Sequence, residues 1–293
     1  MGRFMVLILC VALGLSIVSD IAVGFELKMQ SFEDANKHYV LSIDPTGEPE
    51  AITAQVNAFI EAHPETRTAE ARITEMVNRR MHGIQLKETL DLDGICGNLI
   101  TDVDASILHE FAKLSLEETA SGDGAIIRYA ETGSYLGCSS IMMTSLLPPG
   151  SLVYAHDLWV DWGSGEILAK EGDPPEMIEN YFYHFYENVR SRGLERSIIP
   201  VRGNSSYTLG MHEPESLNIG FIDGDHSYNG VLADLRAMHP LMKPGGVLLL
   251  HDVMNTGEII NPAGEAVRDF CLEERGRVCD FMIGGTEFAR VRI

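Results

Sequence analysis

Basic residues are scarce in this sequence: 22 lysines and arginines stand against 43 aspartates and glutamates, and the formal net charge is −21. A protein that binds nucleic acid without sequence preference needs a basic surface to displace the counterions of the phosphates. An anionic membrane surface attracts basic segments in the same way. The charge therefore argues against nucleic acid and against an anionic membrane surface as partners, and it bears on solubility, not on fold.

Cysteine is also sparse, and the five cysteines follow no CxxC or zinc-ribbon spacing. This excludes the common structural zinc sites. Cys10 lies near the N-terminus, and Cys271 and Cys279 could be bridged in an oxidising compartment. The reading we prefer from sequence is four reduced, mostly buried thiols, which would include Cys96 and Cys138.

One long apolar run lies at the N-terminus. Residues 1–3 carry one basic side chain, residues 4–18 are almost entirely apolar, and small residues occupy positions 22 and 24. This pattern predicts that residues 1–24 are a signal peptide or a membrane anchor, although a full span would bury Asp20. We therefore expect the secretory pathway or membrane attachment, with organelle targeting as an alternative.

The next segment, residues 25–100, is predicted to be a linker and a helical cap. Residues 26–50 are polar and aperiodic, which indicates a linker. Two helical patterns follow, with apolar residues on one face between residues 52 and 60 and again between residues 69 and 77. No motif in this segment indicates chemistry.

A second domain is predicted over residues 101–293. It opens with a helix near Thr101, where Thr101 and Asp104 have the spacing of a capping box. Beyond Gly124, short apolar strands alternate with helices. The strands are expected at residues 125–129, 152–155, 198–201, 217–222 and 247–250, and the helices from about residue 139 and over residues 174–192, 230–239 and 264–274.

The alternation predicts an α/β fold with a Rossmann-like, doubly wound and mostly parallel sheet. Two further apolar runs, residues 278–283 and 287–291, are joined around Gly284 and Gly285 and predict a C-terminal antiparallel β-hairpin. The N-terminal helical cap precedes this domain.

A glycine-containing turn follows the first strand of this sheet. Gly133 and Gly137 have G-x-x-x-G spacing, and Tyr135 interrupts the G-x-G-x-x-G dinucleotide pattern. Glycines at this point let the backbone approach a ligand at the carboxyl end of the sheet. A ligand without pyrophosphate therefore suits the turn better than NAD does, and an ordinary tight turn is the alternative.

Polar residues end the next two strands. Asp157 could accept hydrogen bonds from both hydroxyls of a ribose, or it could cap a turn. Asn204 could accept a hydrogen bond from an adenine amino group, or it could cap the loop in which it lies.

The most specific pattern runs from Phe221 to Asp252. It reads FIDGDHSY over residues 221–228, LMKPGG over residues 241–246, and His251–Asp252. With residues 128–156, this stretch resembles the class I S-adenosylmethionine-dependent methyltransferases, some of which O-methylate small molecules such as sugars with the help of magnesium. The resemblance covers roughly residues 102–293, and such proteins have a Rossmann-like sheet closed by a hairpin.

The resemblance implies a cofactor, S-adenosylmethionine, and a set of binding residues. Glu131, Gly133, Ser134 and Gly137 are similar to the loop on the methionine side of the cofactor. Asp157 is similar to the ribose acid and Asn204 stands at the adenine edge, where an aspartate is common, while Asp223 completes the set. Cys138 stands where a larger basic residue is common.

Methyl transfer requires the acceptor to lose a proton, either to a general base or through metal coordination. His226 is the candidate general base, with Asp223 as the second catalytic candidate. Asp223, His251 and Asp252 are the candidate ligands for Mg²⁺ or another divalent metal, and the histidine shifts the preference toward a softer ion. The alternative is that the two aspartates cap turns and the histidines only form local hydrogen bonds.

Two other functions stay open: a non-catalytic S-adenosylmethionine-binding or interaction module, and an NAD-dependent oxidoreductase. The predicted partner is a small-molecule acceptor, and the sequence sets no oligomeric state. The predicted adenine site overlaps a glycosylation sequon. Asn204-Ser205-Ser206 has the sequon pattern, and a glycan there would obstruct the adenine.

Overall fold

The computed structural model divides into two compact units, residues 1–82 and residues 83–293. The predicted boundary, at residue 100, lies 18 residues further along the chain than the observed one. The structure describes residues 13–21, 24–31, 38–92, 95, 100–119, 126–159, 181–255, 260–273, 277–281, 283 and 286–293.

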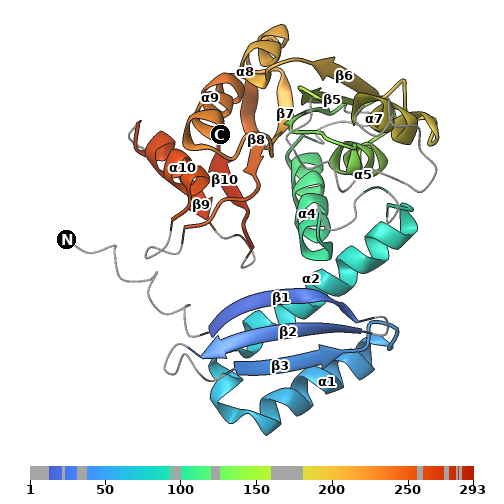
Figure 1. The fold of residues 1–293 in the computed structure, drawn as a ribbon, viewed down its shortest axis with the longest axis vertical. Coiled ribbons are helices and arrows are strands. Elements are labelled where there is room, and N and C mark those ends of the chain that lie inside the picture. The colour runs from blue at the N-terminus through green and yellow to red at the C-terminus, as the bar shows by residue number, and fades with distance from the viewer. Residues whose placement is uncertain are drawn as a thin grey trace. The chain divides into compact units, whose positions relative to one another are not determined.

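The first unit contains an antiparallel sheet in the order β1-β2-β3 (Figure 1). The linker prediction for residues 26–50 is wrong, because β2 (Gly24–Ser31) and β3 (His38–Ile43) are strands. Tyr39, Leu41 and Ile43 alternate along β3 and are all buried, so this strand has one apolar face. Only three positions carry that alternation, which is too short a pattern to stand out in a polar segment.

The predicted leader lies partly outside the described residues, since residues 1–12, 22 and 23 are not described. Its remaining part is β1 (Leu13–Ile21), which pairs with β2. Within the described ranges, no helix has the length and apolarity that a membrane crossing requires.

The two predicted N-terminal helices are confirmed. The first, α1 (Pro49–Ala62), begins with proline. Proline lacks a backbone N–H, and this costs nothing at the first position of a helix, because an N–H there has no partner within the helix. It buries its apolar face and contacts β3. A 3-10 turn, η1 (Pro64–Ala69), leads into α2 (Glu70–Thr89), which passes from the first unit into the second.

The predicted capping box starts α4 (Asp102–Thr119). The backbone N–H of Asp104 donates to Oγ1 of Thr101 at 3.2 Å, and the Asp104 carboxylate accepts from the backbone N–H of Thr101 at 2.9 Å. Nearby, Lys87 at the end of α2 lies 3.3 Å from the carboxylate of Asp102. These contacts fix the start of α4.

The second unit has a seven-stranded sheet in the order β6-β5-β4-β7-β8-β10-β9. The first five are parallel to their neighbours, and β10 and β9 are antiparallel. This confirms the predicted sheet and its terminal hairpin. The strands are β4 (Arg128–Thr132), β5 (Leu152–Asp157), β6 (Ile198–Arg202), β7 (Leu217–Ile222), β8 (Met242–Leu250), β9 (Cys279–Phe281) and β10 (Ala289–Arg292).

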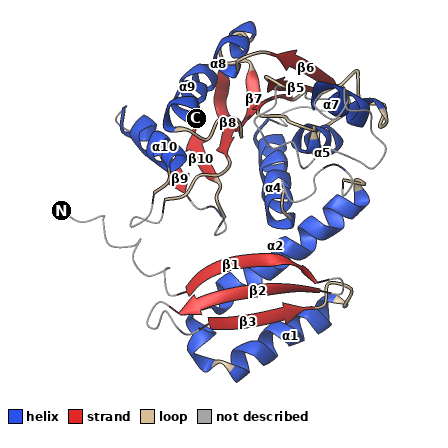
Figure 2. Ribbon diagram, viewed as in Figure 1, coloured by secondary structure: helices blue, strands red, loops and turns tan. Residues whose placement is uncertain are grey.

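Helices lie on both sides of this sheet: α8, α9 and α10 on one side and α4, α5 and α7 on the other (Figures 1 and 2). The strand order reverses between β4 and β7, because the chain passes from β4 outward to β5 and β6 and then returns to β7. In doubly wound sheets, ligands bind at the carboxyl ends of the strands beside such a reversal. The helices are α5 (Cys138–Leu146), α7 (Tyr181–Arg190), α8 (Ser205–Thr208), α9 (Tyr228–Met238) and α10 (Pro262–Glu273), with 3-10 turns η2 (Leu209–Met211) and η3 (His239–Leu241).

Two element boundaries differ from the prediction. The first strand of the sheet is three residues later than expected, so Glu131 belongs to the strand and not to the turn after it. The helix expected over residues 174–192 is observed as α7, and its predicted first turns, residues 174–180, lie outside the described residues.

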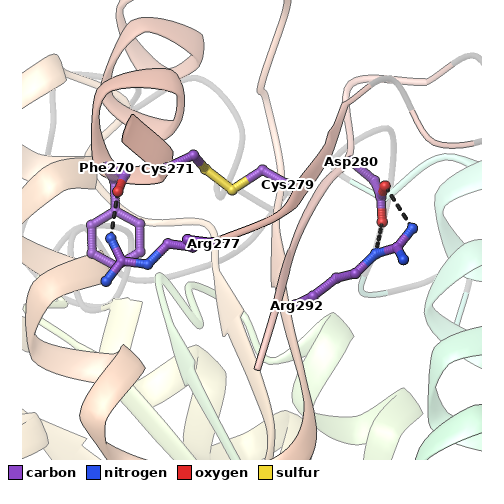
Figure 3. Close-up of a disulfide and its surroundings, with 6 residues drawn as sticks. All are labelled: Phe270, Cys271, Arg277, Cys279, Asp280 and Arg292. Carbon is purple, nitrogen blue, oxygen red and sulfur yellow. Dashed lines mark hydrogen bonds and ion pairs between the residues drawn. A yellow bond between two sulfur atoms is a disulfide. The ribbon is translucent and has the colours of Figure 1, made fainter. Parts of the chain in front are cut away.

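A disulfide joins the end of α10 to the edge strand β9 (Figure 3). Cys271 and Cys279 are bonded, with 6.3 Å between their Cα atoms, and Cys138 is disulfide-bonded too. The preferred reading of four reduced thiols is therefore wrong. Next to the bridge, the guanidinium of Arg277 lies 3.9 Å from the ring centroid of Phe270.

Candidate functional site

A pocket of about 440 Å³ opens at the carboxyl ends of β4, β5 and β7. This is the volume range of small-molecule sites, and the position is the one at which doubly wound sheets bind ligands. The pocket is lined by Gly133, Tyr135, His156, Asp157, Leu158, Trp159, Tyr181, Gly203, Asn204, Ser205, Asp223, Gly224, Asp225 and His226.

The turn after β4 requires glycine at two positions. Gly133 has φ +86°, and a Cβ there would lie 2.0 Å from the carbonyl oxygen of Asp223. Gly137 has φ +89° and donates its N–H to the carbonyl of Ser134 at 2.7 Å. The first glycine therefore lets the ends of β4 and β7 touch, and the second closes the turn before α5.

Asp157 links this turn to the end of β5. Its carboxylate accepts one hydrogen bond from the backbone N–H of Tyr135 at 2.8 Å and another from the backbone N–H of Trp159 at 2.6 Å. The indole N–H of Trp159 donates back to the carbonyl of Tyr135 at 2.9 Å. A carboxylate has about four lone-pair positions, so Asp157 keeps acceptor capacity for a ligand hydroxyl.

The backbone is strained at both partners of Asp157. Tyr135 has φ +44° and Trp159 has φ +45°, a region that bulky residues rarely occupy. Such strain persists only where the surroundings over-determine it, and it is concentrated at ligand sites. Burial raises the pKa of Asp157, while its backbone hydrogen bonds oppose that shift. The aspartate therefore has acceptor capacity in a partly dry setting.

Asn204 performs the capping role that the sequence allowed. Its side-chain oxygen accepts from the backbone N–H of Ser206 at 3.1 Å and from the Ser206 hydroxyl at 2.6 Å, which starts α8. It also lines the pocket. Behind it, Ser205 donates to the buried carboxylate of Asp234 at 2.6 Å. This wall of the pocket is therefore anchored to α9.

Glu131 lies beneath the pocket and not on its wall. It is buried and accepts hydrogen bonds from the hydroxyls of Tyr129, at 2.6 Å, and Ser140. Burial raises the pKa of its carboxyl group. Ser134 is buried as well, and Gly137 is not among the lining residues. These three predicted cofactor residues shape the turn from behind.

His156 is a buried histidine in the pocket that the sequence did not single out. Its Nδ1 lies 2.9 Å from the Thr208 hydroxyl and its Nε2 lies 3.1 Å from Nε2 of His212. Burial, with a contribution from His212, lowers the pKa of His156 to about 3. The ring is therefore neutral at physiological pH and connects β5 to α8 and to His212, the residue that follows η2.

Carboxylates and imidazoles gather beside the pocket, at the ends of β7 and β8. Asp223, His226 and Asp252 each offer one ligand atom, and these atoms lie within 4.8 Å of one another. Two carboxylates and an imidazole suit a divalent cation. Asp252 has φ +53°, a strained conformation that aspartate tolerates better than most residues do.

His251 lies in the same cluster but occupies a different position. Its Nδ1 lies 3.2 Å from Asp223 and its Nε2 lies 3.5 Å from Asp104 of α4. Against the effect of burial, these two carboxylates raise the pKa of His251 to about 11. Both ring nitrogens of His251 face carboxylates, and the ligand atoms that converge in the cluster come from Asp223, His226 and Asp252 and not from His251.

The other ionisable groups of the cluster shift one another's pKa values. A hydrogen bond with Asp223 raises the pKa of His226. Burial opposes ionisation of Asp223, but hydrogen bonds with His226 and His251 outweigh it and lower the pKa of that carboxyl group. Burial and the nearby Asp252 raise the pKa of Glu287. Asp223 is therefore the ionised centre of the cluster.

The comparisons with known proteins agree with this fold. Residues 130–253 match a protein family described as a methyltransferase domain. No curated protein matches the sequence.

The chain carries a class I S-adenosylmethionine-dependent methyltransferase domain.

Two solved structures share the fold of this methyltransferase. One is a candidate O-methyltransferase from Klebsiella pneumoniae, with 17% identity over 72% of this chain and 89% of that one, at a TM-score of 0.50. The other is the O-methyltransferase NovP, with 16% identity over 67% of this chain and 81% of that one, at a TM-score of 0.51.

The structure of the methyltransferase brings most of the predicted residues together. Gly133, Asp157, Asn204, Asp223 and His226 all line the pocket, and Asp252 lies 3.2 Å from His226.

Aromatic side chains also border the site. Trp159 and Tyr181 line the pocket, whereas Phe185 of α7 is fully buried. Asp104 was seen only as a helix cap. No sequence signal places it near His251, because it precedes the family match by 26 residues.

Proposed function

We propose that this methyltransferase transfers the methyl group of S-adenosylmethionine to a hydroxyl oxygen of a small molecule. The observation that supports this most strongly is the position of Asp157. Its carboxylate connects the glycine turn after β4 to the end of β5, and it can accept further hydrogen bonds inside a pocket of about 440 Å³. The names of the two solved structures support oxygen as the acceptor atom.

The chain's own residues supply position and proton removal. Asp157 would accept hydrogen bonds from the ribose hydroxyls of the cofactor, and Asn204 and Ser205 would lie along its adenine ring. His226 stands at the mouth with its side chain 48% exposed, within 3.5 Å of Asp223 and 3.2 Å of Asp252. In its neutral form it would take the proton from the acceptor hydroxyl as the methyl group arrives.

We further propose a divalent cation at Asp223, His226 and Asp252, in place of the set Asp223, His251 and Asp252 that the sequence suggested. Such an ion would lower the pKa of an acceptor hydroxyl. The two roles of His226 exclude each other, because one nitrogen lone pair cannot bind a cation and accept a proton. Activity with and without chelator distinguishes the two roles.

The test is transfer of a radiolabelled methyl group from S-adenosylmethionine to a panel of hydroxylated small molecules, with added Mg²⁺ or Mn²⁺ and with EDTA. Label is expected in an acceptor hydroxyl for the wild type and not for Asp157→Ala. If the cation participates, EDTA abolishes transfer. A folded protein that binds the cofactor and labels no acceptor across the panel would favour the non-catalytic alternative.

We also propose that the chain enters an oxidising compartment. The Cys271–Cys279 disulfide supports this, because such bonds persist mainly outside the cytosol, and the apolar N-terminal run agrees with it. Mass spectrometry of protein from its native source tests the proposal. If the compartment is oxidising, intact disulfides are expected. The same spectra test the cofactor pocket, because a glycopeptide at Asn204 would contradict the assignment of the pocket to the cofactor.

A further inference from the structure

The imidazole of His251 is held on three sides. Nδ1 lies 3.2 Å from Oδ1 of Asp223, and Nε2 lies 3.5 Å from Oδ2 of Asp104. The ring also packs edge-on against Phe288 of the terminal hairpin, with 4.8 Å between centroids. A ring with both nitrogens and one edge engaged has a fixed orientation.

Asp104 reaches this ring from a rigid base. It is 5% exposed and is the third residue of α4, where the capping box with Thr101 fixes its backbone and its carboxylate. The same Oδ2 atom accepts from Thr101 and faces His251. The helix α4 itself packs on the sheet beside β7 and β8, the strands that carry Asp223 and His251.

Asp223 contacts two histidines of the cluster, His251 and His226. Oδ1 of Asp223 is shared between His251, at 3.2 Å, and His226, at 3.5 Å. If the His251 ring turned, Asp223 would lose one of the two contacts that orient its carboxylate. His251 would then also be free to compete with His226 for a cation.

We propose that Asp104 is a positioning residue for methyl transfer: it holds the His251 ring against Asp223 and thereby orients Asp223 toward His226 and Asp252. Asp104 is neither a lining residue of the pocket nor one of the three residues whose ligand atoms converge. It lies outside the matched methyltransferase family segment, so this contact joins the helix that precedes the sheet to the reacting edge. The activity part of the test rests on the proposed function, whereas the spectroscopic part does not.

Three variants of the full chain separate positioning from helix capping. Asp104→Asn keeps an oxygen that can accept from Thr101 but removes the charge facing His251. Thr101→Val removes the hydroxyl of the capping box and leaves Asp104 charged, so it controls for loss of the cap. His251→Gln identifies the His251 signals by their absence.

The spectroscopic measurement is nuclear magnetic resonance of protein labelled with ¹⁵N in the histidine rings. For wild type and Thr101→Val we expect a slowly exchanging ring N–H at Nε2 of His251, because the side chain is only 12% exposed and Nε2 faces the Asp104 carboxylate at 3.5 Å. In Asp104→Asn this signal should shift or disappear. An unchanged signal in Asp104→Asn, or its equal loss in Thr101→Val, would overturn the proposal.

The activity measurement uses the acceptor found in the methyl-transfer screen. Asp104→Asn should lower kcat roughly tenfold or more, the effect of losing one charge-assisted contact at a reacting centre, with the Kd for S-adenosylmethionine unchanged. Thr101→Val should keep kcat near wild type. Equal loss of kcat in both variants would make Asp104 a helix cap only. If the wild type transfers no methyl group, the proposed function fails and the ring N–H signal alone decides the role of Asp104.

Discussion

The carboxylate of Asp157 accepts a hydrogen bond from the backbone N–H of Tyr135 at 2.8 Å, which joins the end of β5 to the turn after β4. One acidic side chain thus connects the two loops that border the ribose end of the predicted cofactor site. Trp159 completes the connection from the other side through its indole N–H. A ligand that bonds to Asp157 would therefore stabilise both loops.

Gly133 should be intolerant of a side chain. In Gly133→Ala, the new Cβ would lie 2.0 Å from the backbone of Asp223, so the ends of β4 and β7 must separate. We expect loss of cofactor binding and a drop in stability well beyond the roughly 1–2 kcal/mol that a left-handed backbone costs alanine. Denaturant unfolding and calorimetric titration measure the two effects.

Gly150→Ala is the matched control, because Gly150 has φ +90° and open space where its Cβ would lie. It should show only the backbone cost and bind the cofactor normally. Equal behaviour of the two variants would mean that close approach at Gly133 is unimportant.

Removing Asp252 from the proposed cation site should weaken binding. Asp252→Asn removes one charge, and asparagine tolerates the positive φ of this position. We expect Mn²⁺ affinity to fall by roughly tenfold or more, because the site loses a charged ligand. Asp225→Asn changes the net charge equally outside the three-residue set and should change affinity little. Similar losses in both would indicate non-specific attraction to acidic residues.

Cation binding and proton removal should both depend on the protonation of His226. A contact with Asp223 raises its pKa above the ordinary value of 6.5. Its protonated ring can neither bind a cation nor accept a proton, so binding and activity should rise with pH through a midpoint above that value. Measurements from about pH 5.5 to 8.5 cover this transition. His226→Gln should remove the rise, and an unchanged profile would assign the dependence to another group.

The disulfide between α10 and the edge strand should stabilise the second unit. In the chain-entropy description, a loop closed over this separation of eight residues contributes about 2.5 kcal/mol. The double variant Cys271→Ala/Cys279→Ala should then melt roughly 5–10 °C lower than wild type. Scanning calorimetry of the oxidised wild type and the double variant checks this. Equal melting temperatures of the two proteins would contradict a stabilising role.

The sequence predicts the sheet well because its central strands contain short apolar runs between turn residues, and β7 is buried at all six positions. β2 and β3 could not be recognised from the sequence, because apolar and polar residues largely alternate along them and such short alternating segments do not stand out within a polar stretch. The early placement of the first strand has a related cause. Glu131 and Thr132 are polar yet buried within β4, and the Glu131 carboxylate is satisfied there by the hydroxyls of Tyr129 and Ser140.

The candidate site was predictable where neighbouring strand ends carry its residues, as for Gly133, Asp157 and Asp223. The roles within the histidine and aspartate cluster were not. His251 contacts Asp104, which is 147 residues before it in the chain and reaches it only through the packing of α4. Sequence spacing contains no information on such a contact.

The central claim is S-adenosylmethionine binding at Asp157, and calorimetric titration of the full chain tests it most directly, with NAD as the competing ligand and Asp157→Ala as the variant. We predict binding of S-adenosylmethionine, none of NAD, and a loss of roughly tenfold or more in the variant, because two charge-assisted hydrogen bonds are removed. Equal binding by Asp157→Ala, or no binding by folded wild type, would contradict this account.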